Sequence, residues 1–100
     1  MNFHLTLEQA REALARESNP FILLMKDKAM RVEYFSPKGI DTQAPHSQDE
    51  LYVITSGTSD FIRASETVRC KMGDVLFVPS GMVHRFQNFS NDFATWVIFY

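Results

Sequence analysis

The chain has 100 residues, of which 45% are hydrophobic and 22% are charged, and its formal net charge is −2. This composition is ordinary for one globular domain, and scattered basic residues on a weakly acidic chain give no general attraction to nucleic-acid phosphates. With a single cysteine, no apolar stretch near the ~20 residues of a membrane span and no secretory-type N-terminus, we expect one cytoplasmic domain over residues 1–100, without nucleic-acid or membrane partners.

The first predicted element is a helix over about residues 6–17. Thr6 and Gln9 have the spacing of a capping box, and apolar side chains recur on one face after them. The helix is expected to end at Asn19, because a residue that precedes a proline disfavours helical backbone angles. Such a short amphipathic helix is expected to pack across a sheet.

From residue 21 to residue 100 the chain consists of short apolar or alternating segments separated by turn signals. Segments of about five residues at this spacing indicate an antiparallel β-sandwich or barrel. The segments ELYVIT (50–55) and FATWVIFY (93–100) are apolar on both faces. The second apolar face is expected to cover another sheet, the helix or a second copy of the chain. Because so small a barrel exposes strand edges, we expect a homodimer.

The segment GDVLFVPSGMVHRFQN, residues 73–88, predicts a strand, a tight turn and a returning strand. Gly73 permits the sharp entry into the first strand, and Pro79 ends its pairing because proline has no N–H. Ser80 and Gly81 form the turn, and His84 begins the returning strand. This arrangement places the His84 imidazole at the mouth of a barrel, facing inward.

The same segment resembles the second motif of the cupin superfamily, Gly-x5-Pro-x-Gly-x2-His-x3-Asn. All five fixed positions are matched, by Gly73, Pro79, Gly81, His84 and Asn88. The resemblance covers roughly residues 30–100. It implies a small cupin whose barrel, over about residues 21–100, is an antiparallel jelly roll (double-stranded β-helix) preceded by one short helix.

The first cupin motif ends His-x-His-x3-Glu-x6-Gly, and the chain supplies His46, Glu50 and Gly57 in this register. It departs from the motif at Ala44, where the other histidine would stand. The leading glycine of the motif, Gly39, lies one residue closer than the pattern expects.

The resemblance implies that one divalent metal ion, of iron, manganese, zinc or nickel, is bound inside the barrel by His46, Glu50 and His84. Two imidazoles and one carboxylate can hold one face of such an ion and leave positions open to water, substrate or dioxygen. Zinc with an activated water is equally compatible with these ligands. Gln43 and Gln48 are candidates to orient the ligands or to supply an oxygen ligand.

Four aromatic residues are further candidates for the second shell of ligands or for the pocket wall: Tyr34, Tyr52, Phe86 and Trp96. A pocket lined by tyrosine and tryptophan would favour a compact aromatic or carboxylated substrate. Cys70 is expected to be a buried core thiol rather than a nucleophile, since it alternates with apolar residues.

The resemblance implies a metal-dependent enzyme of the dioxygenase, isomerase or decarboxylase type that acts on a small molecule. The alternative is a non-catalytic small-molecule-binding or sensor cupin with a weakened or absent metal site, which Ala44 favours. A structural dimerisation domain is a third interpretation. Without a metal, His84 and Glu50 are expected to hydrogen-bond each other in a polar lumen.

Overall fold

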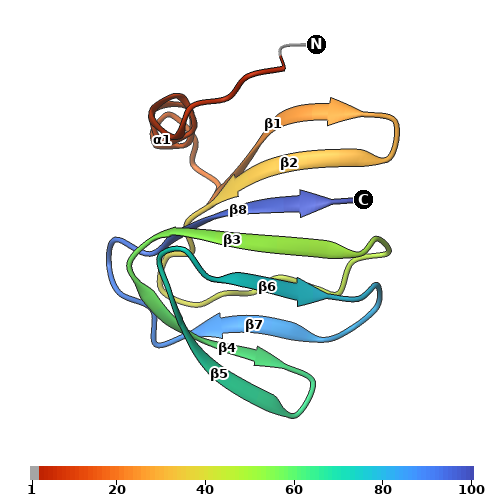
Figure 1. The fold of residues 1–100 in the computed structure, drawn as a ribbon. Helices are drawn as coiled ribbons and strands as arrows, with labels where there is room; N and C mark the ends of the chain where they lie inside the picture. Colours follow the sequence, from red (N-terminus) through yellow and green to blue (C-terminus); the bar gives the residue numbers. More distant parts are fainter. Residues whose placement is uncertain (1–2) are drawn as a thin grey trace.

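The computed structural model describes residues 3–100 and contains two antiparallel sheets and one short helix over that range (Figure 1). The elements in chain order are α1 (Leu7–Ala15), β1 (Phe21–Asp27), β2 (Met30–Phe35), β3 (Glu50–Ser56), β4 (Thr58–Arg63), β5 (Glu66–Lys71), β6 (Val75–Val78), β7 (His84–Gln87) and β8 (Ala94–Phe99).

The five-stranded sheet has the order β1-β2-β8-β3-β6, and the three-stranded sheet has the order β5-β4-β7. All the strand pairs in both sheets are antiparallel. Strands that are neighbours in a sheet are often distant in sequence, as β8 is from β2 and β3. This crossed order of two facing sheets is that of a jelly roll, so the predicted fold class is confirmed.

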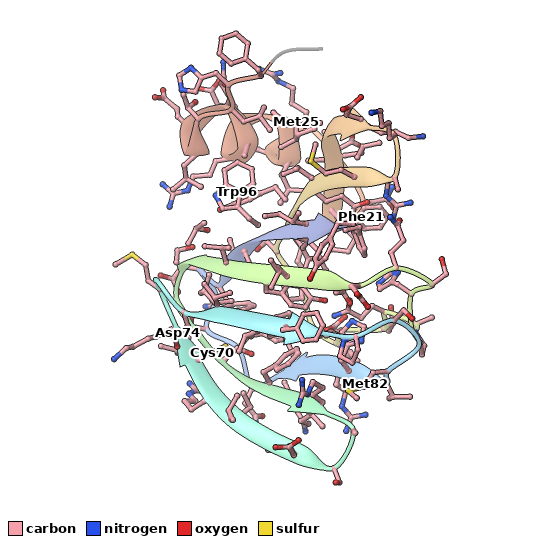
Figure 2. The ribbon with its side chains drawn as sticks, turned by 45° about the vertical axis from the view of Figure 1, so that its right-hand side comes forward. Phe21, Met25, Cys70, Asp74, Met82 and Trp96 are labelled. Carbon is pink, nitrogen blue, oxygen red and sulfur yellow. The ribbon has the colours of Figure 1, made fainter. Side chains whose placement is uncertain are left out.

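The N-terminal helix begins as its capping residues predict. Thr6 Oγ1 accepts the backbone N–H of Gln9 at 3.0 Å, and Gln9 Oε1 accepts that of Thr6 at 3.0 Å. The helix ends at Ala15, two residues before the predicted end, where the chain turns. Its buried Ala10 packs against the outer face of the five-stranded sheet at Tyr34 and Trp96. Figure 2 shows Trp96 next to α1. In residues 3–100 no helix has the length and hydropathy needed to cross a membrane.

The two strands that are apolar on both faces, β3 and β8, lie next to each other inside the five-stranded sheet. On β8, Val97 and Phe99 face the other sheet, whereas Ala94 and Trp96 face α1. The second apolar face of β8 is therefore covered by the N-terminal helix. This is one of the three alternatives that the sequence allowed.

Aromatic rings fill the space between the two sheets. Phe86 contacts Tyr52, Phe61 and Phe93 with ring centroids 4.8–5.0 Å apart. Cys70 also lies in this interior and is 1% exposed, as predicted. Val68 and Met72, two residues before and after Cys70, are exposed, because β5 is an edge strand of which Cys70 is the one buried residue.

Gly57 is the only residue between β3 and β4, where the chain leaves one sheet for the other. Its φ is +73°, and a Cβ atom at this position would lie 2.7 Å from Phe93 Cα and against Ser90 Oγ. Glycine is required both for the left-handed backbone and for the close approach of the two segments. This explains why the last position of the first motif is a glycine.

Candidate metal centre

His84 is placed by the turn between β6 and β7. Gly81, with φ +78°, turns the chain and donates its backbone N–H to the carbonyl of His46 at 2.7 Å. The backbone N–H of Ser80 donates to Asp49 Oδ1 at 2.8 Å. The turn of the second motif is therefore fastened directly to the segment that carries the first.

The first-motif ligands lie in and after the irregular stretch between β2 and β3. Glu50 is the first residue of β3 and pairs with Val78 on one side and Phe99 on the other. The carbonyl of Asp49 accepts the backbone N–H of Tyr100 at 3.1 Å. The sheet register thus fixes Glu50, while His46 is held through its own carbonyl by the turn between β6 and β7.

The structure brings the three predicted metal ligands together. One potential ligand atom from each of His46, Glu50 and His84 lies within 4.8 Å of the other two. His84 Nε2 is 2.6 Å from Glu50 Oε1, and both side chains are essentially inaccessible to solvent. His46 is half-buried at the rim, with its ring centroid 5.6 Å from that of His84. The three donors converge from two sheets and one loop.

The hydrogen bonds and charges around the two imidazoles suit a ligand role. His84 Nδ1 lies 2.8 Å from the carbonyl of Met82, which can only accept, so Nδ1 carries a proton and Nε2 faces the site. Burial lowers the pKa of His84, but the Glu50 carboxylate and the Met82 carbonyl outweigh burial, so the net pKa is raised. Burial lowers the pKa of His46, and the nearby His84 lowers it further. His46 is therefore neutral at pH 7.

The Glu50 carboxylate provides the test of whether a cation fits. Its contact with His84 lacks hydrogen-bond geometry, and neither Glu50 oxygen has a hydrogen-bond partner within residues 3–100. A buried carboxylate without hydrogen-bond partners is strongly unfavourable unless a positive charge compensates it. In metal-free protein a protonated His84 supplies that charge at 2.6 Å. A divalent ion between the carboxylate and the two imidazoles would supply it when both imidazoles are neutral, so the residues present fit the group that the motifs imply.

Gln43 also faces the centre, on the side where the motif lacks a histidine. Its Oε1 lies 3.2 Å from His84 Nε2 and accepts the hydroxyl of Tyr52 at 2.9 Å. Burial holds the pKa of Tyr52 well above its ordinary value, so the phenol stays protonated and donates. The second lone pair of the Gln43 carbonyl oxygen faces His84 Nε2.

Asp41 fixes which way the Gln43 amide points. Gln43 Nε2 donates to Asp41 Oδ2 at 2.6 Å, and a carboxylate can only accept, so Oε1 is turned to the ligands. Asp41 is itself buried and accepts the backbone N–H of Phe86 at 2.8 Å. Sequence reasoning missed Asp41, and an isolated aspartate in an irregular stretch gives no signal that would have found it.

Three of the predicted supporting residues lie elsewhere. Tyr34 and Trp96 face α1, where Tyr34 donates to or accepts from Thr55 at 2.9 Å, because their strand parity points them out of the barrel. The Gln48 amide donates to the carbonyl of Ala29 in the β1–β2 turn. The predictions that these three line the site are therefore corrected, and with them the substrate preference that rested on tyrosine and tryptophan.

The two remaining candidates lie behind the centre rather than in its wall. Tyr52 contacts Gln43 through its hydroxyl, and its ring centroid is 6.1 Å from that of His84. Phe86 stacks in the core and touches the site only through its backbone N–H on Asp41. Both residues support side chains that face the site.

A cavity of about 320 Å³ adjoins the centre at His46. Ala44 and Gln43 form part of its wall, and Arg31 and Glu33 bring charges from β2. Sequence reasoning did not select Arg31 or Glu33, because the strand parity of β2 was not fixed by its alternation alone.

Comparisons with known proteins agree with this architecture. A cupin-2 domain-containing protein of Shewanella frigidimarina superposes with a TM-score of 0.74 at 13% identity, covering 94% of this chain and 92% of that one. KdgF of a Halomonas species superposes with a TM-score of 0.72 at 16% identity, covering 84% and 82%. An uncharacterized protein of Streptomyces coelicolor is 28% identical over 95 residues, covering 93% of this chain and 90% of the relative.

The match to a family model extends over most of the chain. Residues 31–100 match the model of the cupin domain, Cupin_2, which includes all three converging donors and both motif segments. The sheet order, the two motifs and this match lead to one conclusion: the chain belongs to the cupin family.

Proposed function

We propose that this cupin binds one divalent metal ion through His46, Glu50 and His84 and presents it to a small molecule in the adjoining cavity. The observation that carries the proposal is the Glu50 carboxylate, which is buried without a hydrogen-bond partner within residues 3–100 between two imidazoles. Gln43 adds a neutral oxygen on the side of Ala44, where an imidazole is missing.

The arrangement suits a metal-dependent enzyme of the dioxygenase, isomerase or decarboxylase type. A bound ion would supply Lewis acidity or a site for dioxygen at the positions that the protein leaves open. The protein contributes two imidazole nitrogens, one carboxylate charge and a hydrogen-bonded frame. Glu50 and the histidines serve as ligands and not as acid or base. Phe99 contacts the His46 ring, with centroids 4.9 Å apart, and places an apolar surface on that side of the centre.

Ala44 favours a second candidate function, a binding or sensor protein that uses the barrel without chemistry. One imidazole fewer lowers metal affinity, and a site that is empty in the cell leaves only the cavity to bind a ligand. Metal content separates the two functions.

The experiment is elemental analysis of protein purified without chelator or nickel resin. We expect close to one equivalent of iron, manganese, zinc or nickel, lost in His84→Ala and in Glu50→Gln. Gln48→Ala is the matched control, because Gln48 lies only two residues from each first-motif ligand yet bonds to Ala29. Wild-type protein that stays metal-free after incubation with each of the four ions would refute the proposal.

We further propose a cytoplasmic homodimer in which β1 meets its counterpart in a second copy. Strand β1 is an edge of the five-stranded sheet, and its Phe21 and Leu23 are nearly half exposed. Exposed apolar edge strands tend to pair with another chain. Light scattering should give twice the chain mass for the wild type and for Val75→Lys on the opposite edge, and the chain mass for Leu23→Lys.

A further inference from the structure

The guanidinium of Arg31 has no hydrogen bond within residues 3–100. Its Nε is buried without a partner, and its one ion pair, to Glu33, has an N–O distance of 3.8 Å, which is too long for a hydrogen bond. The guanidinium carbon lies 4.6 Å above the ring of Phe99. An arginine held over an aromatic ring with its donors unused is available to bind a planar anion.

The same cavity wall joins Arg31 to the metal centre. Phe99 contacts the guanidinium on one side and the imidazole of His46 at 4.9 Å on another. Arg31, Phe99 and His46 all line the 320 Å³ cavity, together with the apolar side chains of Phe35 and Val97. One small molecule is therefore able to touch both the guanidinium and the centre.

Ala44 makes room for such a molecule. Ala44 lines the cavity together with Gln43 and His46. It occupies the position where the first motif would have its other histidine. A methyl group leaves space that an imidazole at the same position would take up. The departure from the motif thus opens the cavity on the side of the ligands.

We propose that this cavity binds a small organic carboxylate, with its carboxylate paired to Arg31 and its apolar body lying along Phe35, Val97 and Phe99 towards His46. The proposal rests on the proposed function, because the end of the molecule near His46 would face the metal ion. Pairing two parallel N–H groups of arginine with two carboxylate oxygens gives orientation as well as affinity.

Glu33 is the neighbouring charge that opposes an anion. Burial raises the pKa of Glu33, and the field of Glu50 raises it further against the opposite effect of Arg31. The negative form of Glu33 is therefore less favoured than that of an exposed glutamate, which weakens the repulsion. A protonated Glu33 would also donate a hydrogen bond to the bound carboxylate.

The test compares acids with amides of the same shape on zinc-loaded protein. Calorimetry is run with acetate, benzoate and phenylacetate and with acetamide, benzamide and phenylacetamide. We expect at least one acid to bind about tenfold more tightly than its amide, as a charge-assisted pair requires. Arg31→Gln should abolish this ratio, and Arg11→Gln on the exposed side of α1 should keep it. Equal affinities for every pair, or a ratio unchanged in Arg31→Gln, would overturn the proposal.

Two further measurements locate the ligand and keep the proposals apart. Ala44→His should retain or gain metal and lose the acid, because the added ring fills the cavity. Manganese-loaded protein should broaden the ring-proton signals of a bound aromatic acid, and zinc-loaded protein should not. Full metal content without any acid-selective binding would refute this proposal alone. Arg31-dependent acid binding to a protein that takes up no metal would refute the proposed function and the orientation towards the ion.

Discussion

The two motif regions build their halves of the centre in different ways. The second-motif region, Gly73–Asn88, contains β6 of the five-stranded sheet, β7 of the three-stranded sheet and the turn between them, which places His84 at the start of β7. The first-motif region runs through an irregular stretch before β3, and of its donors only Glu50 belongs to a strand. The second-motif region matches its motif at every fixed position, whereas the irregular stretch lacks a histidine at Ala44 and offers the amide of Gln43 instead.

This difference shows that a ligand in a regular strand is harder to replace by a neighbouring residue than a ligand in an irregular stretch. In β7 the register with β4, where His84 lies opposite Arg63, decides where each side chain points, so a neighbouring residue cannot take over the place of His84. In the irregular stretch the direction of a side chain depends on local hydrogen bonds, such as those from Gln43 to Asp41 and from Tyr52 to Gln43. A neighbouring residue can then face the site in place of the missing one.

The largest expected contrast is between the two histidines. His84→Ala leaves Glu50 buried and uncompensated, so we expect it to lower the free energy of unfolding of metal-free protein by about 3 kcal/mol. His46 is half-buried, and His46→Ala should cost less than about 1 kcal/mol while also preventing metal binding. Urea unfolding in the presence of chelator measures both. Equal losses would contradict the unequal roles assigned to the two regions.

The next largest contrast is expected in the stability cost of replacing a glycine in each motif. Gly57→Ala adds a Cβ atom 2.7 Å from Phe93 Cα at a left-handed position, so we expect a loss of about 3 kcal/mol. Gly81 has a similar φ but open space around it, so Gly81→Ala should cost about 1 kcal/mol from backbone strain alone. Thermal unfolding measures the loss of stability in each variant. A larger loss for Gly81→Ala than for Gly57→Ala would contradict this order and show that the turn between β6 and β7 is the more tightly constrained.

Gln43 provides a smaller test of the irregular region. Because its oxygen faces His84 and its amide is fixed by Asp41, Gln43→Ala should weaken zinc binding about tenfold. Asp41→Asn should have part of this effect, since an asparagine can turn its own N–H towards Gln43 Nε2. Competition with a chromophoric chelator measures the affinities. Unchanged affinity in Gln43→Ala would restrict the centre to the three motif residues.

The pH dependence of metal-free protein should be the smallest effect. The folded pKa of His84 is raised above its ordinary value, so its contribution to stability is complete below the unfolded pKa of about 6.5 and is lost as pH rises through the folded pKa. His46, whose pKa is lowered, acts only below pH 6.5 and there reduces stability. Unfolding midpoints measured with chelator should therefore decrease as the pH rises above about 6.5. Glu50→Gln should flatten this slope, and a slope that persists would assign it to another group.

Bound zinc should give the opposite dependence of stability on pH. Protons compete with the ion for the two imidazoles, so metal is expected to leave below about pH 6, where unperturbed histidines take up protons. Metal-loaded protein should consequently be more stable at pH 8 than at pH 5.5. A full equivalent retained at pH 4.5 would argue against histidine ligation.

The parts of the structure that were predictable from sequence are those fixed by local rules. The capping box of α1 and the strand, turn and strand that place His84 at the start of β7 follow from residue types at set spacings, and the resemblance to the cupin motifs implied the three converging donors. The inward or outward parity of Tyr34 and Trp96 was not predictable in this way, because it depends on which face α1 covers. The partner of Gln48 was not predictable either, since a turn distant in sequence supplies it.

The bond from the Gly81 N–H to the His46 carbonyl has a mechanical consequence. It ties the turn before His84 to the loop that carries His46, so we expect the two segments to move together rather than apart. Ala44 and His46 line the same cavity, which is the side on which we expect both an ion and an organic molecule to enter. A bound organic molecule should then slow the escape of the ion.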